Sequence, residues 1–273
     1  MIFATDLDKT LIYSYRHLTD ETHNVEIVEF KDDKPLSYMT NKAFNTLWRL
    51  KQRTDMIIVP VTARSTDQFN RILVTGNCPY AIVASGATIL ENGKPMKDWD
   101  NIVTKIREQN TDIYKLFMSQ LSQIDSPDDS SSKDDMAEPY FEIQPRLVNN
   151  SVIFFKLTEK AIASRFPVRL KKEADKHDWN FTLQGQKGYL APKGISKENA
   201  LSYLSVKLKD DDIITAGDGT LDVPFIKLGN IMKFIPEYSE AYYHQDECSP
   251  CIIIPNGLIG VDTMLDIISK IYI

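Results

Sequence analysis

The chain has 273 residues, 42% of them hydrophobic and 26% charged, with a formal net charge of -6, and it can bury a full core in one large or two moderate domains. This acidity excludes nucleic acid as a general partner, because phosphate backbones are held by concentrated Lys and Arg. No apolar run approaches the roughly 18 residues of a membrane helix, and no basic region precedes an apolar one at the N-terminus, so we expect a cytoplasmic protein with no membrane partner.

The chain opens on a short apolar strand that ends in carboxylates. Residues 1–4 are apolar, Asp6 and Asp8 follow one residue apart, and Thr10 comes next. Open α/β sheets bind ligands outside the carboxyl ends of their strands, so we expect the active site here. Two carboxylates this close need a compensating cation or hydrogen bonds. A D-x-D-x-T pattern also arises by chance, where it caps a helix or lies in a loop.

The next hundred residues predict alternating strands and helices. A hairpin is expected from two β-like runs that flank residues 31–35, and it is either a flap at the active edge or an ordinary surface ribbon. Thr62 and Arg64 follow an apolar strand and offer a hydroxyl and a guanidinium. The expected elements are hairpin strands at 25–30 and 36–39, helices at 43–50 and 68–73, and strands at 56–61 and 81–84. This order predicts a doubly wound sheet.

The pattern changes between residues 87 and 188, which predict a separate α/β module. Its expected elements are helices at 101–124 and 167–177 and strands at 88–90, 140–143, 152–157 and 181–183. Residues 125–138 are rich in Ser and Asp and predict a surface loop. The basic residues Arg165, Arg169, Lys171 and Lys172 either receive an anionic substrate or form a solvated helix face.

The last part of the chain predicts a second acidic strand end. Ser196 fits the N-cap of a helix with Lys197 in its first turn. An apolar strand at 213–216 leads into Asp218 and Asp222, and strands at 231–235 and 251–254 and a helix at 261–271 follow. The two acidic ends could meet around one hard divalent ion such as Mg²⁺. Alternatively, Asp218 and Asp222 cap the next helix.

The three cysteines do not form a disulfide framework for a chain of this size. Cys78, Cys248 and Cys251 are expected to be ordinary thiols. Two alternatives stay open, a partial zinc site with His244 and a redox pair of Cys248 and Cys251. A structural zinc needs four ligands, and no second pair exists.

Four segments, in this order, resemble the haloacid dehalogenase (HAD) superfamily of phosphatases. The matches are the D-x-D-x-T motif at Asp6, Asp8 and Thr10, the strand-end hydroxyl at Thr62 with Arg64 as in a T-G-R motif, the lysine at Lys197, and the G-D-x-x-x-D motif at Gly217, Asp218 and Asp222. The order is similar to the Cof-like and sucrose-phosphatase-like branch, in which an α/β cap lies between the second and third motifs. Ser85, Gly86 and Ala87 resemble the start of that cap.

The resemblance implies an α/β fold with a Rossmann-like doubly wound parallel sheet core at 1–86 and 189–273 and an inserted α/β cap domain at 87–188. Two positions depart from the pattern. Relatives usually carry Asn where Leu221 stands, and often Gly where Lys9 stands. Leu221 would remove a polar contact near the metal or the phosphate, and Lys9 would alter the floor of the pocket.

The resemblance also implies a Mg²⁺-dependent phosphatase of a small phosphorylated metabolite, with a sugar phosphate as the expected class. Asp6 would be the nucleophile that forms an aspartyl-phosphate, and Asp8 would be the general acid and base. Mg²⁺ would be held by Asp6, the main-chain carbonyl of Asp8 and Asp218, assisted by Asp222. Thr62 and Lys197 would bind the phosphoryl oxygens, with Thr10 and Arg64 in the phosphate pocket.

Several alternatives to these roles remain. Arg64 either reaches the phosphate or pairs with a carboxylate on the helix that it precedes, and Lys193 could replace Lys197. An acid at Asp8 favours a phosphatase or a mutase, because ATPase and dehalogenase relatives depart from it. The other two functions considered are a phosphomutase acting on sugar phosphates and a non-catalytic phosphate-binding module. We expect a monomer or weak homodimer.

Overall fold

The computed structural model describes residues 1–18, 24–123 and 139–271. These residues form two compact units, Met1–Asp100 together with Ser196–Ile273, and Asn101–Ile195. The sequence placed the inserted segment at 87–188. The acidic segment 125–138, expected to be a surface loop, lies outside the described residues.

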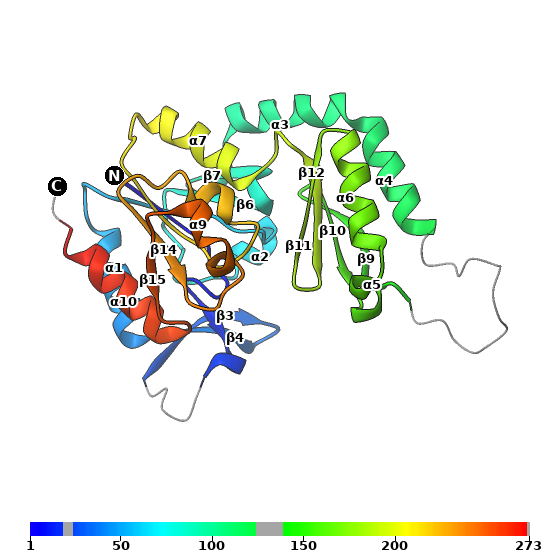
Figure 1. The fold of residues 1–273 in the computed structure, drawn as a ribbon. Coiled ribbons are helices and arrows are strands. Elements are labelled where there is room, and N and C mark those ends of the chain that lie inside the picture. Colours follow the sequence, from blue (N-terminus) through cyan, green and yellow to red (C-terminus); the bar gives the residue numbers. More distant parts are fainter. Residues whose placement is uncertain (19–23, 124–138, 272–273) are drawn as a thin grey trace. The chain divides into compact units, whose positions relative to one another are not determined.

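The first unit contains a five-stranded parallel sheet in the order β15-β14-β13-β1-β5 (Figure 1). Its strands are β1 (Ile2–Thr5), β5 (Ile57–Pro60), β13 (Ile213–Ala216), β14 (Met232–Pro236) and β15 (Ile252–Ile254). Because β1 lies between β5 and β13, the strand ends that lead into Asp6, Thr62 and Asp218 are neighbours at one edge. The predicted Rossmann-like parallel core is confirmed.

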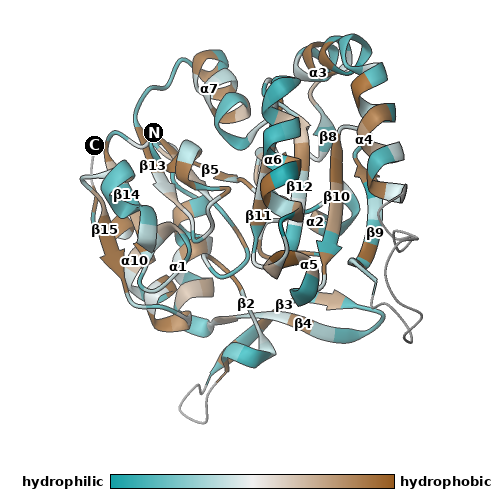
Figure 2. Cartoon of the chain, turned by 45° about the vertical axis from the view of Figure 1, so that its right-hand side comes forward, coloured by the Kyte–Doolittle hydropathy of each residue, from teal (hydrophilic) through white to brown (hydrophobic). Residues whose placement is uncertain are grey.

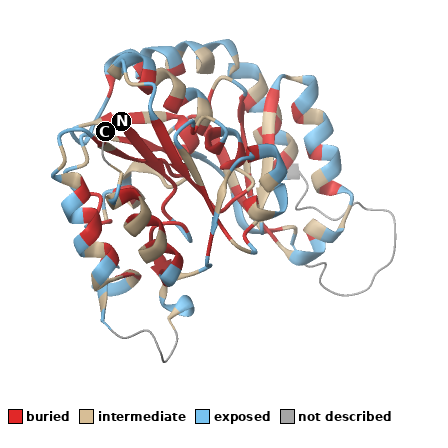
Figure 3. Ribbon diagram, turned by 60° about the vertical axis from the view of Figure 1, so that its left-hand side comes forward, coloured by how far each residue is buried: buried red, intermediate tan, exposed pale blue. Residues whose placement is uncertain are grey.

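Helices cover this sheet on both faces. The helices α1 (Asn41–Lys51) and α10 (Leu258–Ser269) contact each other, and α7 (Lys197–Leu208) contacts α8 (Val223–Ile226), which packs on β13. Figure 1 shows α1 and α10 on one side of the sheet and α7 on the other. The strands are short and mostly apolar, as expected for a sheet buried on both faces. Every residue of β1 and β13 is buried, and Figure 3 shows the middle of the sheet in the colour of buried residues.

The predicted hairpin is present. It consists of β3 (Val25–Lys31) and β4 (Lys34–Thr40), and β4 also pairs with β2 (Tyr13–Ser14). Asp32 and Asp33 at its turn have φ values of 50° and 59°, the left-handed conformation that a two-residue hairpin turn of the primed type requires. A register shift between Ile27 and Glu29 marks an irregularity in β3.

The helix predicted at 68–73 is shorter than expected. The helix α2 spans only Thr66–Phe69, with Ser65 as its N-cap in a capping box. The following residues leave the helix because they pair with the hairpin, where the Leu73 N–H donates to the Val28 carbonyl at 2.8 Å. The other short elements of this unit are the 3-10 helices at Tyr15–His17, Ala84–Gly86 and Ala241–His244, the strands β6 (Tyr80–Val83), β7 (Thr88–Glu91) and β8 (Lys94–Pro95), and the helix α9 (Gln245–Cys248).

The second unit is built on a four-stranded antiparallel sheet in the order β11-β12-β10-β9. Its strands are β9 (Phe141–Val148), β10 (Val152–Leu157), β11 (Trp179–Gln184) and β12 (Lys187–Pro192), and its helices are α3 (Lys97–Gln109, which begins in the first unit), α4 (Thr111–Gln123), α5 (Glu159–Ala163) and α6 (Phe166–Lys176). The strand β12 was not predicted. Figure 2 shows hydrophilic and hydrophobic residues side by side along α4 and α6, as expected for amphipathic helices that pack on one face.

The single helix predicted at 101–124 is two helices. The break lies at Asn110, whose side chain donates to the Ile106 carbonyl and accepts from the Trp179 indole, both at 2.8 Å. A side chain that bonds to the backbone and to a distant ring competes with a continuous helix. No helix within the described residues combines the length and the apolar character needed to cross a bilayer.

Candidate active site

The acidic residues predicted from two distant segments meet at the carboxyl edge of the parallel sheet. The Asp6 N–H donates to the Ala216 carbonyl, and the Val61 N–H donates to the Thr5 carbonyl, both at 2.8 Å. These bonds continue the pairing of β1 with both of its neighbours beyond the strand ends. Asp6 and Asp218 are 6% and 5% exposed, so their charges lie in a water-poor environment.

Lys197 lies within this acidic cluster. Its Nζ donates to Asp6 Oδ1 at 2.7 Å and to Asp222 Oδ1 at 2.6 Å, and the residue is only 3% exposed. The side chain starts from the first residue of α7, where the Ser196 hydroxyl caps the helix by accepting from the Asn199 N–H. Burial alone would lower the pKa of Lys197, but Asp222 and Asp6 outweigh it and raise the pKa above its ordinary value. The lysine is therefore a fixed positive charge.

The three aspartates have the geometry of a metal site. Asp6, Asp218 and Asp222 each offer an oxygen, and these atoms lie within 4.8 Å of one another. Asp218 Oδ1 is buried and has no hydrogen-bond partner among the described residues. Asp222 Oδ2, in contrast, accepts from the N–H groups of Asp218 and Gly219 at 3.2 and 2.9 Å. Hard carboxylate oxygens suit a divalent ion such as Mg²⁺. The residues thus fit a divalent metal ion. Asp222 also holds the loop that starts at Asp218, through its hydrogen bonds to the backbone.

The carboxylates destabilise one another despite the Lys197 ammonium. Burial, together with the charges of Asp222 and Asp8, raises the pKa of Asp6 to about 7 against the opposing effect of Lys197. Burial likewise raises the pKa of Asp218 well above its ordinary value, with Asp6 and Asp222 adding to the effect. Protons would therefore occupy part of the cluster near neutral pH unless a divalent ion replaced them.

Gly86 allows the close approach of the 3-10 turn Ala84–Gly86 to the start of α7, which places Lys197. A Cβ at Gly86 would lie 2.0 Å from the Ser196 carbonyl oxygen and 2.9 Å from the Lys197 nitrogen, and the φ of Gly86 is +95°. The preceding residues Ala84 and Ser85 also have positive φ, at 50° and 54°. This turn is strained and tightly packed.

We expect Gly86→Ala to lower the free energy of unfolding by about 3 kcal/mol or more, because it combines a left-handed φ with a backbone clash. Gly93→Ala is the matched control, since Gly93 has a φ of +76° and a Cβ added there would meet no atom within 4 Å. Its cost is expected to be about 1–2 kcal/mol, from strain alone. Urea unfolding curves of the two variants measure the difference, and equal costs would contradict this account of Gly86.

Thr62 and Thr10 are both buried, at 1% exposure each. The Thr62 hydroxyl accepts from the Arg64 N–H at 3.2 Å, and the Thr62 carbonyl accepts from the Ser85 N–H at 3.0 Å. Thr10 Oγ1 and Ser85 Oγ are buried, and no hydrogen-bond partner for either lies in the part of the chain that the structure describes. Unpaired buried hydroxyls are costly and uncommon, so these two are candidate ligand-binding groups.

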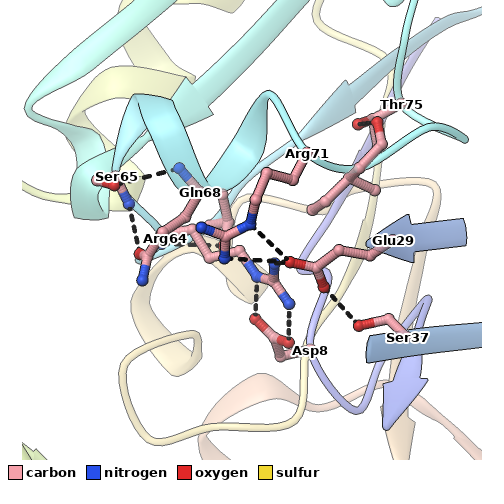
Figure 4. Close-up of polar contacts among 10 residues, drawn as sticks. Asp8, Glu29, Ser37, Arg64, Ser65, Gln68, Arg71 and Thr75 are labelled. Atoms are coloured by element: carbon pink, nitrogen blue, oxygen red, sulfur yellow. Dashed lines mark hydrogen bonds and ion pairs between the residues drawn. The ribbon is translucent and has the colours of Figure 1, made fainter. Parts of the chain in front are cut away.

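Asp8 and Arg64 form an ion pair with two hydrogen bonds. Arg64 Nε donates to Asp8 Oδ2 and Nη2 donates to Asp8 Oδ1, both at 2.7 Å (Figure 4). Arg64 Nη1 donates to Glu29 Oε1, also at 2.7 Å. The sequence left open whether Arg64 reaches the phosphate or pairs with a carboxylate on the following helix. Among the described residues its carboxylate partners come instead from the loop after β1 and from the hairpin.

Glu29 was missed by the sequence analysis. It lies on β3 and is 1% exposed, and its carboxylate contacts Arg64, Arg71 and Ser37 (Figure 4). The available signal was an acidic residue in an otherwise apolar stretch of the strand. A buried acid needs cationic partners.

The other predicted candidates lie elsewhere. Lys193 Nζ pairs with Asp178 at 2.7 Å, in the second unit. The basic residues of α6 are exposed, and Lys171 and Lys172 line a hollow of about 410 Å³ in the second unit. All three cysteines are free thiols, and within the described residues only the three aspartates form a cluster with metal-ligand geometry.

The two departures from the family pattern have different settings. Lys9 has a φ of 61°, the left-handed region in which glycine is the least strained residue. This explains why glycine suits the position. Leu221 is partly buried in the turn between Asp218 and Asp222, and nothing in the structure explains the choice of leucine.

Comparisons with known proteins agree on the fold. No protein-family model and no curated protein matches the sequence. Among solved structures, the chain is similar to the sucrose-phosphatase from Synechocystis sp., solved with sucrose and phosphate, at 13% identity and a TM-score of 0.64 over 99% of this chain and 98% of that one. It is also similar to the C-terminal domain of Candida albicans trehalose-6-phosphate phosphatase, at 12% identity and a TM-score of 0.58 over 99% and 92%.

A third similar structure is a phosphatase of the haloalkanoate (HAD) enzyme superfamily from Bacteroides thetaiotaomicron, at 14% identity and a TM-score of 0.58 over 99% of this chain and 95% of that one. The similarity covers nearly the whole length of all three chains. The fold that the sequence motifs predicted is therefore confirmed, and the chain has the α/β fold of these phosphatases.

Proposed function

We propose that the chain is a Mg²⁺-dependent phosphatase that hydrolyses a small phosphorylated metabolite, of the sugar phosphate class, through an aspartyl-phosphate on Asp6. The observation that carries the proposal is the Lys197 ammonium between Asp6 and Asp222, next to the unpaired oxygen of Asp218. Three solved structures of the same fold are named as phosphatases, one of them as a sucrose-phosphatase and another as a trehalose-6-phosphate phosphatase. They support the reaction type and the substrate class.

In the proposed reaction, an Asp6 carboxylate oxygen attacks the phosphorus atom and the bond to the leaving oxygen breaks. Asp8 gives its proton to that oxygen and later takes a proton from the water that hydrolyses the aspartyl-phosphate. The two steps return Asp6 and Asp8 to their starting states and yield inorganic phosphate and an alcohol.

The groups around Asp6 stabilise the charge that the phosphoryl group carries. The Lys197 ammonium and the Thr62 hydroxyl bind its oxygens as a fixed charge and a fixed donor. Asp6, the main-chain carbonyl of Asp8 and Asp218 would hold Mg²⁺, assisted by Asp222, and the bound ion would neutralise phosphoryl charge. Phosphate esters hydrolyse so slowly in water that positioning and charge neutralisation must supply most of the catalysis.

The inserted α/β segment, predicted at 87–188, is proposed to act as a cap that selects the organic part of the substrate. Its antiparallel sheet and helices form a compact unit of their own at Asn101–Ile195. None of the four sequence motifs lies in it, which leaves it free to carry specificity. The core then supplies the chemistry common to all substrates.

Phosphate release from a panel of phosphorylated sugars, with and without Mg²⁺, tests the proposal. Release that depends on Mg²⁺ and is fastest with a sugar phosphate is the expected result. Transfer of the phosphoryl group to a sugar acceptor without free phosphate would show a mutase instead. Binding of the same compounds without turnover would show a non-catalytic phosphate-binding module.

We expect Mg²⁺ to stabilise the protein more strongly at pH 8 than at pH 6. The unfolded chain loses the Asp6 proton near pH 3.8, whereas the folded chain keeps it to about pH 7. The free energy of unfolding of the metal-free protein therefore falls as the pH rises through this window. Mg²⁺ binds the deprotonated cluster, so its affinity is expected to fall about tenfold between pH 8 and pH 6.

Thermal unfolding at fixed Mg²⁺ concentration measures this effect through the shift in midpoint. The control is Asp218→Asn, which removes the negative charge and replaces one carboxylate oxygen by an amide nitrogen, and it is expected to reduce the Mg²⁺-dependent shift at pH 8. A shift that is equal at both pH values, or unchanged in Asp218→Asn, would contradict the proposed metal site.

A further inference from the structure

We propose that Glu29 of the hairpin is a positioning residue for Asp8, which it controls through Arg64. This inference rests on the proposed phosphatase function, in which Asp8 transfers protons at the leaving oxygen. Glu29 anchors the Arg64 guanidinium to the hairpin, and this anchor lets Asp8 separate from Arg64 and turn toward the reacting phosphate.

Glu29 is buried, although the alternation of side chains along its strand would not place it in the interior. An undisturbed strand alternates its side chains between two faces, yet Val28 and Glu29 are 0% and 1% exposed. The register shift between Ile27 and Glu29 explains this, since a β-bulge turns an extra side chain inward. The bulge therefore directs a carboxylate into the interior.

Both carboxylate oxygens of Glu29 accept hydrogen bonds. Ser37 Oγ donates to Glu29 Oε2 at 2.6 Å, and Arg64 Nη1 and Arg71 Nη2 donate to Oε1 at 2.7 and 3.3 Å (Figure 4). Burial would raise the pKa of Glu29, but these hydrogen bonds and the charge of Arg64 lower it overall. Glu29 is therefore an anion held between Ser37 and the two arginines.

The two carboxylates that contact the Arg64 guanidinium differ in their exposure to water. Its guanidinium is planar and rigid, so the bond to Glu29 fixes the direction of the edge that faces Asp8. The Glu29 side chain is 1% exposed, whereas that of Asp8 is 50% exposed. Water reaches the exposed Asp8 carboxylate and can replace its hydrogen bonds to Arg64, whereas the Glu29 carboxylate is shielded from water. Asp8 is therefore the partner that can leave.

The charges of this group of side chains balance. Two cations, Arg64 and Arg71, lie with two anions, Glu29 and Asp8. If Glu29 were neutral, Asp8 would be the only anion bonded to Arg64 among the described residues. The pair would then be held more tightly, and the proton donor would be withheld from the leaving oxygen.

Glu29→Gln is the test, because it removes the charge and keeps the shape. The readout is kcat/KM for a series of substituted phenyl phosphates, which reports the steps up to formation of the aspartyl-phosphate. We expect about a tenfold loss for phenyl phosphate, whose poor leaving group needs a proton, and less than about a twofold loss for p-nitrophenyl phosphate. The matched control is Glu26→Gln on the exposed face of β3, which should match the wild type for every substrate.

A second variant separates positioning from a merely structural role. Arg64→Lys replaces the guanidinium that makes two hydrogen bonds to Asp8 by a single ammonium, which holds Asp8 less tightly. Adding Arg64→Lys to Glu29→Gln should therefore restore the wild-type dependence of kcat/KM on the leaving group, even if kcat/KM falls by the same factor for every substrate. If Glu29→Gln fails to fold, the charge-balanced double variant Glu29→Gln with Arg71→Gln is measured against Arg71→Gln alone. The same tenfold loss with phenyl phosphate is expected.

Equal losses for all phenyl phosphates in Glu29→Gln would overturn the inference and leave Glu29 a structural residue. Failure of Arg64→Lys to restore the dependence would overturn it as well. If the wild-type protein released no phosphate from any ester, the proposed function itself would have failed, which is a separate result.

Discussion

Asp6→Asn is expected to lower kcat for phosphate release by at least about 10⁴-fold, because it removes the attacking carboxylate. The variant should still fold. Asn keeps the shape and can accept from Lys197 Nζ, which lies 2.7 Å from Asp6 Oδ1. The measurements are steady-state phosphate release with Mg²⁺ and thermal unfolding.

The stability of this variant distinguishes loss of a nucleophile from loss of the fold. Since the pKa of Asp6 is raised to about 7 by burial and by its acidic neighbours, the variant should be at least as stable as the wild type in metal-free buffer at pH 8. The control is Asp211→Asn, an exposed aspartate in the same unit, which should keep full activity. A folded Asp6→Asn protein with wild-type turnover would refute the assignment.

Lys197→Met has the second large expected effect. We expect kcat to fall roughly 10³-fold, since the fixed charge beside the phosphoryl oxygens is lost. We also expect the free energy of unfolding of the metal-free protein at pH 8 to fall by about 3–5 kcal/mol, because Asp6 and Asp222 would stay buried without their cation. Kinetics and urea unfolding measure the two effects.

Lys193→Met is the matched control for this change. Lys193 is four residues away, and its ammonium pairs with the exposed Asp178. Both kcat and stability should stay near the wild-type values, because an exposed ion pair is worth at most about 1 kcal/mol. Large losses in Lys193→Met and none in Lys197→Met would show that the phosphate-binding lysine had been misidentified.

The sequence predicted the strand ends of the site because the signal is local. A short apolar run followed at once by Asp, or by a strand-end Thr, needs only the geometry of a parallel sheet to place those side chains at its edge. The order of the strands brings the ends together, with β1 between β5 and β13. The resemblance to a known family supplied the roles.

The partners of Arg64 could not be predicted in the same way. Strict alternation along β3 gives no reason to expect Val28 and Glu29 to be buried together, and a bulge is a tertiary feature that a single sequence rarely reveals. The break of the long helix at Asn110 has a similar origin, because its partner Trp179 lies 69 residues away. Long-range polar contacts were the part of the structure that local patterns missed.

The most direct test of the central claim is chemical trapping of the phosphorylated carboxylate. The protein is mixed with p-nitrophenyl phosphate and Mg²⁺, quenched in acid and treated with borohydride, which reduces an acyl phosphate to an alcohol. Mass spectrometry of the N-terminal peptide is predicted to find homoserine at position 6 and unchanged aspartate at position 8. Unmodified Asp6 during turnover, or reduction at another carboxylate, would contradict the account.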